Sequence, residues 1–164
     1  MAQKTRSPEV ISMVSTEQTK RYLDTNILVY SIDLSRENRP KHRAALEILR
    51  PGRLEILCLS SQVVAEFYSV VTGSKSVAHP LTPQETISRI ERFMQMPNIE
   101  FLSMSDEVFQ QWLELLKIHP VSGARVFDLM HLAIMQCHQV ESIYTFNADD
   151  FNWQTEIKVI IPSA

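Results

Sequence analysis

Residues 21–30, with the sequence RYLDTNILVY, form the strongest local pattern in the chain. They predict a short buried strand that ends at Asp24 and then a helical turn. An acid directly after such a strand indicates a binding site, because ligand sites in an open parallel sheet gather outside the carboxyl ends of the strands. Asp24-Thr25-Asn26 is also a good turn sequence, so a turn-forming role for Asp24 stays open.

Outward from this stretch, apolar runs of strand length alternate with helical patterns. The further strands are predicted at residues 55–59, 99–102, 142–146 and 157–161, and the helices at residues 40–49, 61–72, 82–96, 105–119 and 124–139. Thr82 and Glu85 have the spacing of a capping box, and Ser60 or Ser61 can cap the helix that follows the second strand.

This alternation predicts an α/β protein. We expect a three-layer α/β/α sandwich with a mainly parallel sheet of about five strands, because strands that alternate with helices pair in parallel and bury both faces of the sheet. The chain divides into a polar N-terminal lead-in, residues 1–19, and one domain, residues 20–164.

The composition excludes several classes of protein. Of 164 residues 45% are hydrophobic, and only 3 are glycine, which leaves little material for a glycine-rich phosphate loop. Cys58 and Cys137 lie in apolar runs without metal-binding spacing, which predicts buried reduced thiols. No apolar run is long enough for a membrane span or a signal peptide, so we expect a cytoplasmic protein without membrane contact. The net charge of −3 decides little about nucleic acid, because cations held by the acids would offset it.

Two acidic residues lie among apolar residues in predicted helices. Glu66 lies between Val63 and Val70 on or beside an apolar stripe, although an exposed helix edge explains it equally well. Asp128 is the sharper case, since residues 126–135 are apolar all round except for Asp128 and His131, which predicts a helix buried on nearly every face. An ion pair with Arg125 is the structural alternative for Asp128.

A third acidic position follows the fourth predicted strand. Asn147 and Asp150 come just after it, as Asp24 comes after the first strand. Asp149 is interpreted as the solvated member of the Asp149-Asp150 pair, but which of Asn147, Asp149 and Asp150 completes the site stays open. Several carboxylates at one end of a sheet repel each other, and hard divalent cations relieve that repulsion. All-oxygen ligation favours Mg²⁺ or Mn²⁺. A zinc site is not expected, because the five histidines lack ligand spacing.

Four segments together resemble the PIN-domain family, and most closely its VapC-type toxins from prokaryotic toxin–antitoxin pairs. They appear in the family's order: YLDTN at residues 22–26, SQVVAEF at 61–67, SGARVFD at 122–128 and TFNADDF at 145–151. The resemblance covers about residues 20–162 and implies a small α/β/α sandwich that acts on single-stranded RNA. It implies four residues that are catalytic and bind metal: Asp24, Glu66, Asp128 and Asp150. It also implies four secondary residues of the pocket: Thr25, Asn26, Thr145 and Asn147.

The resemblance also implies partners. In the toxins, the helices that correspond to residues 72–97 often form a clip used in dimers and in antitoxin binding, so a homodimer and an antitoxin protein are expected. The lead-in precedes the point where family members commonly begin, and its role is open.

The predicted function is hydrolysis of RNA phosphodiester bonds with one or two Mg²⁺ or Mn²⁺ ions. Basic residues at the rim would meet backbone phosphates, the candidates being Arg36, Arg39, Lys41, Arg43 and Arg125. Residues 36–43 could equally be a solvated helix face. The rival is a PIN-like scaffold that binds RNA or protein without cutting. A phosphatase with a nucleophilic Asp24 fits less well, because Asn26 stands where that chemistry usually has a second Asp.

Overall fold

Five parallel strands form the centre of the molecule in the computed structural model, which describes residues 18–73, 77, 79–153 and 156–163. Most of the predicted lead-in, residues 1–17, lies outside the described residues. The spatial order is β3-β2-β1-β4-β5. The strands are β1 (Lys20–Leu23), β2 (Ile56–Ser60), β3 (Ile99–Leu102), β4 (Ser142–Tyr144) and β5 (Lys158–Ile160).

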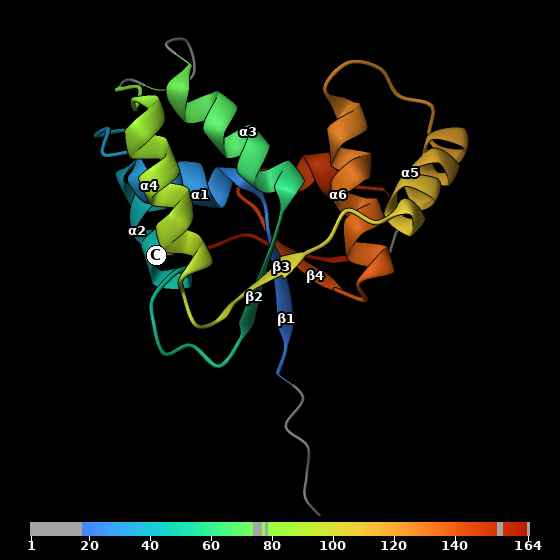
Figure 1. Cartoon of the computed structure of the whole chain (residues 1–164), viewed down its shortest axis with the longest axis horizontal. Helices are drawn as coiled ribbons and strands as arrows, with labels where there is room; N and C mark the ends of the chain where they lie inside the picture. Colours follow the sequence, from blue (N-terminus) through green and yellow to red (C-terminus); the bar gives the residue numbers. More distant parts are fainter. Residues whose placement is uncertain (1–17, 74–76, 78, 154–155, 164) are drawn as a thin grey trace, which may run out of the picture.

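Six α-helices among the described residues cover this sheet. Figure 1 shows the first four gathered on one side of the strands and the last two on the other side, which confirms the predicted α/β/α sandwich. A 3-10 turn, η1 (Ala148–Phe151), follows β4. The helices are α1 (Thr25–Ile32), α2 (Arg39–Ile48), α3 (Ser61–Thr72), α4 (Pro83–Met94), α5 (Asp106–Ile118) and α6 (Arg125–Cys137).

Side-chain caps begin three of the six described α-helices. The Ser60 side chain accepts a hydrogen bond from Val63 N and begins α3, and Ser105 caps α5 in the same way. At α4, Thr82 and Glu85 form the full capping box, each accepting from the other's backbone N–H. These side chains satisfy amide donors that would otherwise lack partners in the first turn of a helix.

Three local predictions need correction. The helical turn after Asp24 is a full helix, α1, because Ile27 and Leu28 are completely buried and hold it against the core. The fourth strand ends at Tyr144, two residues earlier than predicted. Helix α6 is not buried on nearly every face: its first turn is open, with Phe127 48% exposed, and continuous burial begins only near Leu129.

The composition also led to expectations about membrane spans and about the two cysteines. No helix in the described ranges is both long and apolar enough to span a bilayer. Both cysteines are free thiols, but only Cys58 is buried as predicted, while Cys137 is half-buried.

The strand order places a ligand crevice beside β1. The chain builds β1, β2 and β3 toward one edge and then returns to place β4 on the other side of β1. Tyr22 and Leu23 in β1 are completely buried, so the strand lies inside the core. The order reverses between β1 and β4, and such a reversal opens a crevice at the carboxyl ends of the strands. Asp24 follows β1 at this point, and Thr145 follows β4.

Candidate active site

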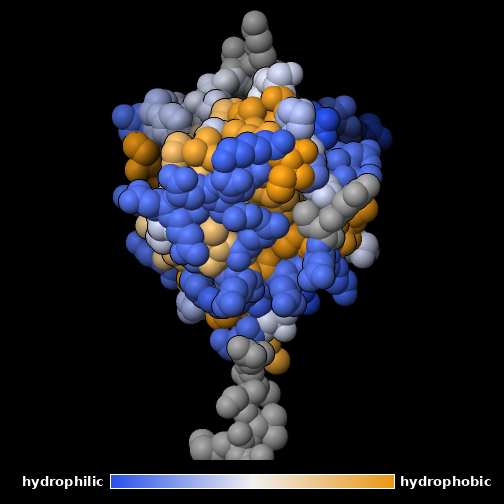
Figure 2. Space-filling model, turned by 90° about the vertical axis from the view of Figure 1, so that its right-hand side faces the viewer, coloured by the Kyte–Doolittle hydropathy of each residue, from blue (hydrophilic) through white to orange (hydrophobic). Residues whose placement is uncertain are grey.

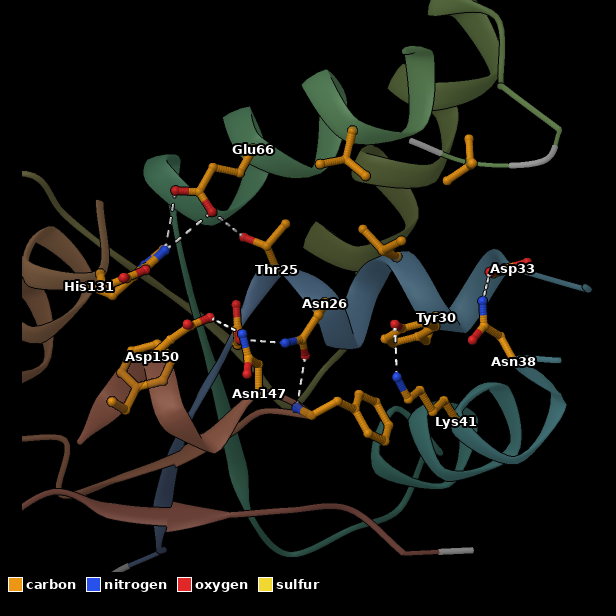
Figure 3. A pocket seen from close by; sticks show the side chains of 17 residues that line it. Thr25, Asn26, Tyr30, Asp33, Asn38, Lys41, Glu66, His131, Asn147 and Asp150 are labelled. Atoms are coloured by element: carbon orange, nitrogen blue, oxygen red, sulfur yellow. Dashed lines mark hydrogen bonds and ion pairs between the residues drawn. The ribbon is translucent and has the colours of Figure 1, made fainter. Parts of the chain in front are cut away.

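A cavity of about 570 Å³ opens at the carboxyl edge of the sheet. Five acidic residues line it, among them Asp33 and all four predicted site acids: Asp24 after β1, Glu66 in α3, Asp128 in the first turn of α6 and Asp150 in η1. Figure 3 shows the groups around this cavity, with Glu66 on the α3 side and Asp150 on the η1 side. Asp149, which the sequence assigned to solvent, is exposed and is not part of the lining.

Asp24 is buried and held by two neighbouring residues. Its Oδ2 accepts hydrogen bonds from Asn26 Nδ2 at 2.6 Å and from Thr145 Oγ1 at 2.5 Å, and its carboxyl group also interacts with the backbone N–H of Asn26. Burial raises the pKa of Asp24, although the Thr145 hydrogen bond acts in the opposite direction. Thr145 is not itself in the cavity wall; it supports Asp24 from behind and accepts a hydrogen bond from Asn147 N.

Glu66 is held by three donors. Its Oε2 accepts from Thr25 Oγ1 at 2.7 Å, its Oε1 accepts from Gln62 Nε2, and His131 Nε2 lies 3.3 Å from both oxygens. Burial by itself would raise the pKa of Glu66, but the His131 contact and the other two donors outweigh it and lower the pKa. Glu66 is therefore a fixed carboxylate with little freedom to rotate.

His131 connects Glu66 to the core. Its Nδ1 lies 3.0 Å from Tyr22 Oη, which in turn lies 2.6 Å from Ser60 Oγ. Because the ionised Glu66 can only accept, His131 Nε2 carries the proton. In a neutral ring Nδ1 then accepts from Tyr22, and Tyr22 accepts from Ser60. A directed chain of hydrogen bonds thus runs from the end of β2 through β1 and α6 to the cavity.

Asp128 has no hydrogen bond or ion pair within the described part of the chain. The ion pair with Arg125 proposed as an alternative does not form, because the guanidinium carbon lies over the Trp153 ring, 4.6 Å from its centroid. Burial, followed by the negative charge of Asp150, raises the pKa of Asp128 to about 6. Asp150 accepts a hydrogen bond from Asn147 Nδ2.

A family model matches most of the chain. The model described as PIN domain covers residues 21–152, a range that contains the four predicted site acids. This chain belongs to the PIN-domain family. No curated protein sequence matches it.

Solved structures share the fold of this PIN domain. A toxin–antitoxin complex from Klebsiella pneumoniae aligns with a TM-score of 0.55 at 20% identity, covering 87% of this chain and 97% of the other. The Sarcin-Ricin loop cleaving toxin VapC20 of Mycobacterium tuberculosis gives 0.60 at 14% identity, with 84% and 98% covered. VapBC2 from Rickettsia felis, bound to a DNA fragment from its promoter, gives 0.60 at 22% identity, with 87% and 98% covered. At these identities the likeness establishes the fold.

Of the five predicted RNA-binding residues, one lines the cavity and four do not. Lys41 lies in the cavity wall, whereas the four arginines proposed with it are absent from the lining, and all four are exposed: Arg36, Arg39, Arg43 and Arg125. Among the secondary residues, Thr25, Asn26 and Asn147 line the cavity. Sequence reasoning weighed His131 only as a zinc ligand and missed its bond to Glu66. Its position three residues after Asp128, in an otherwise apolar run, was the available signal.

The donor set of the cavity fits a hard divalent ion by its chemistry. The Asp128 carboxylate has no hydrogen-bonding partner among the described residues, and burial together with the negative charge of Asp150 raises its pKa; a cation would offset that charge. In the part of the chain that the structure describes, however, no three His, Cys, Asp or Glu side chains converge closely enough to ligate one ion. Ligation would require side-chain rotation, and the least restrained of the four predicted acids are Asp128, with no protein donor among the described residues, and Asp150, with one.

Proposed function

We propose that this PIN domain is a divalent-metal-dependent endoribonuclease of the VapC toxin type, which hydrolyses phosphodiester bonds in single-stranded RNA. One observation carries the proposal: four acids that are far apart in the sequence line one cavity at the carboxyl edge of the sheet. Such a concentration of negative charge is costly for a protein that only binds, because RNA is itself an anion.

The residues have distinct roles in this proposal. Asp24 and Asp128 hold one or two Mg²⁺ or Mn²⁺ ions: the Asp128 carboxylate has no hydrogen-bonding partner among the described residues, and Asp24 lines the same cavity directly after β1. The bound ion supplies an activated water and stabilises charge on the phosphate. Glu66, fixed by Thr25 and His131, orients the attacking water or completes the ligand set. Asp150 acts from η1, with Asn147 holding its carboxylate.

Protein partners are a second part of the proposal. One structure with this fold is a toxin–antitoxin complex, and we propose that an antitoxin protein controls this chain as well. A neighbouring reading frame that encodes a small DNA-binding protein would support this part, and an isolated gene would count against it.

We also propose a homodimer. Figure 2 looks onto the side where α5 and α6 lie and shows hydrophobic surface among hydrophilic side chains. Large exposed apolar side chains on these helices are Phe109, Ile118 and Phe127. Large apolar side chains exposed on two neighbouring helices support a protein contact on this side of the molecule. A monomeric mass by light scattering at micromolar concentration would contradict the dimer.

The main test is cleavage of a single-stranded RNA by the purified protein with Mn²⁺. We expect Asp128→Asn to lower the rate by at least about 100-fold, since loss of a residue that only supports a metal ligand already costs about 10- to 100-fold. Excess EDTA should abolish cleavage. The matched control is Asp149→Asn, which removes the same charge from an exposed neighbour of the site and should retain the activity.

The outcomes separate the proposal from its rival. Cleavage that persists at full rate in Asp128→Asn or in EDTA would overturn the metal-nuclease mechanism. RNA binding without cleavage, together with no Mn²⁺ binding by calorimetry, would instead support a non-cleaving RNA- or protein-binding scaffold.

A further inference from the structure

Lys41 is a cation in the wall of a cavity that five acidic residues also line. Its Nζ lies 4.5 Å from the centroid of the Tyr30 ring and 5.9 Å from that of Phe146, and it donates a hydrogen bond to Tyr30 Oη at 3.0 Å. The two rings pack edge to face, with centroids 5.1 Å apart. Figure 3 shows Lys41 reaching toward Tyr30 beside α1, on the opposite side of Asn26 from Asp150. The aromatic pair therefore holds the ammonium in place at the cavity wall.

No carboxylate neutralises this ammonium. Within the described ranges Lys41 forms no ion pair, although the same cavity contains five acidic side chains. Asp33, the acid toward that end of the cavity, is engaged elsewhere: its oxygens accept from Ser35 N and Asn38 Nδ2. Among the residues that the structure describes, one of the three N–H donors of Lys41 has a protein partner, which leaves two for a ligand.

The start of α2 adds to the positive potential. Lys41 lies in the first turn of this helix, which has no acidic residue there and no side-chain cap. The amino end of a helix carries partial positive charge and favours anions, so a lysine at this position is electrostatically unfavourable without an anionic partner. A half-buried cation at such a position, turned toward a cavity, fits an anionic ligand.

We infer that Lys41 binds a backbone phosphate of the RNA next to the phosphate that is cut. The cavity then takes a segment with at least two phosphates, one at the acidic end and one at Lys41. Tyr30 and Phe146 are positioning residues that hold the ammonium. This inference rests on the proposed nuclease function, because the phosphate at Lys41 is defined as the neighbour of the phosphate that is cut.

Dinucleotides test the inference by cleavage. One substrate has a single phosphodiester, and two others carry an added 5′- or 3′-phosphate. The wild type should cleave one phosphorylated form with a kcat/KM on the order of tenfold higher than the unphosphorylated form, the size of one charge-assisted hydrogen bond. Lys41→Met, which keeps the aliphatic stem over the rings, should abolish that difference. The matched control Lys117→Met removes the same charge from an exposed site on α5 and should keep it.

A binding measurement tests the site without catalysis. A ten-nucleotide single-stranded RNA is titrated with Asp128→Asn protein at fixed Mg²⁺ over a series of KCl concentrations. Adding Lys41→Met should reduce the slope of log K against log salt by about 0.7, the value for one phosphate contact in single-stranded nucleic acid. Adding Lys117→Met should leave the slope unchanged. Tyr30→Leu should also weaken RNA binding, because the Lys41 ammonium loses its hydrogen-bond acceptor and the ring beneath it.

The outcomes distinguish this inference from the proposed function. If RNA is not cut but Lys41→Met lowers the salt slope, the nuclease proposal fails and the phosphate site stands. If RNA is cut but neither added phosphate improves cleavage and the slopes of Lys41→Met and Lys117→Met agree, the inference is overturned.

Discussion

At the scale of single residues, the cavity acids differ in how firmly the protein holds them. Among the described residues, Glu66 has three protein donors, Asp24 has two side-chain donors on Oδ2, Asp150 has one and Asp128 has none. A carboxylate with few protein donors keeps lone pairs for a ligand, whereas a saturated one acts through its fixed position. His131 is the residue that decides the position of Glu66, because it alone connects that carboxylate to the buried Tyr22.

This difference predicts the effect of changes at His131. His131→Leu removes the donor to Glu66, while His131→Gln can present an N–H at nearly the same place. We expect His131→Leu to weaken Mn²⁺ binding by about 10- to 100-fold, the usual cost of losing a residue that orients a metal ligand. His131→Gln should recover most of the affinity.

Calorimetry with Mn²⁺ measures this, and melting curves show whether either variant is unfolded. Because both substitutions disturb the same buried pocket, a purely structural role would affect the two alike. Equal Mn²⁺ affinity in the two variants would therefore contradict the positioning role.

At the scale of elements, the site depends on where strands end and helices begin. Three site segments follow strands directly: Asp24 after β1, α3 after β2, and Thr145 after β4. Helix α4 stands outside the cavity but supports it indirectly, because Phe93 packs edge-on against Phe67 of α3, the helix that carries Glu66. The ends of α4 are therefore relevant to the cavity even though no α4 residue lines it.

The capping box of α4 gives a stability prediction. Thr82→Ala removes both the acceptor for Glu85 N and the partner of the Glu85 side chain. We expect the free energy of unfolding to fall by about 1 kcal/mol, the typical cost of losing a side-chain cap. Urea denaturation measures the change as a lower midpoint at an unchanged slope.

The control is Ser88→Ala, an exposed position inside the same helix. Alanine has the higher helix propensity, so this variant should be as stable as the wild type or slightly more stable. If Thr82→Ala matched Ser88→Ala, the capping box would contribute nothing to the stability of the domain.

At the scale of the whole molecule, negative charge is concentrated in the cavity. Burial raises the pKa of both Asp24 and Asp128, the latter to about 6 with the added effect of Asp150. A carboxyl whose pKa is higher in the folded chain than in the unfolded chain binds its proton more tightly when folded. Its contribution to stability is therefore complete below the unfolded pKa and is lost as the pH rises through 6.

The ion-free protein should accordingly melt at a lower temperature at pH 7.5 than at pH 5. In Asp128→Asn this drop should be smaller by roughly 2–4 °C, the shift that 1 kcal/mol produces in a domain of this size. Added Mn²⁺ should raise the melting temperature more at pH 7.5 than at pH 5, because the ion replaces the proton.

Thermal melts at the two pH values, with EDTA or Mn²⁺, measure these effects. Asp149→Asn is the control, since its carboxylate is exposed and outside the cavity. An equal drop in melting temperature in the wild type, Asp128→Asn and Asp149→Asn would contradict the assignment of this pH dependence to Asp128.

The sequence by itself determined the elements and the family. Strand and helix positions followed from hydrophobic period and from caps such as Thr82 with Glu85, because these signals act between neighbours along the chain. The order of four acidic motifs identified the family that residues 21–152 then matched. The catalytic roles of Asp24, Glu66, Asp128 and Asp150 stay predictions, although the fold does bring all four to one cavity.

Only the tertiary structure decided which side chains meet. The order β3-β2-β1-β4-β5 brings Thr145 to Asp24 and His131 to Glu66, contacts across 121 and 65 residues that no local pattern encodes. The packing of α2 against α1 likewise decides what Lys41 contacts: Lys41 reaches Tyr30 of α1, whereas Arg43, two residues later on the same helix, is exposed. The physical reason is that periodicity gives each residue a face, whereas strand order and packing determine what that face contacts.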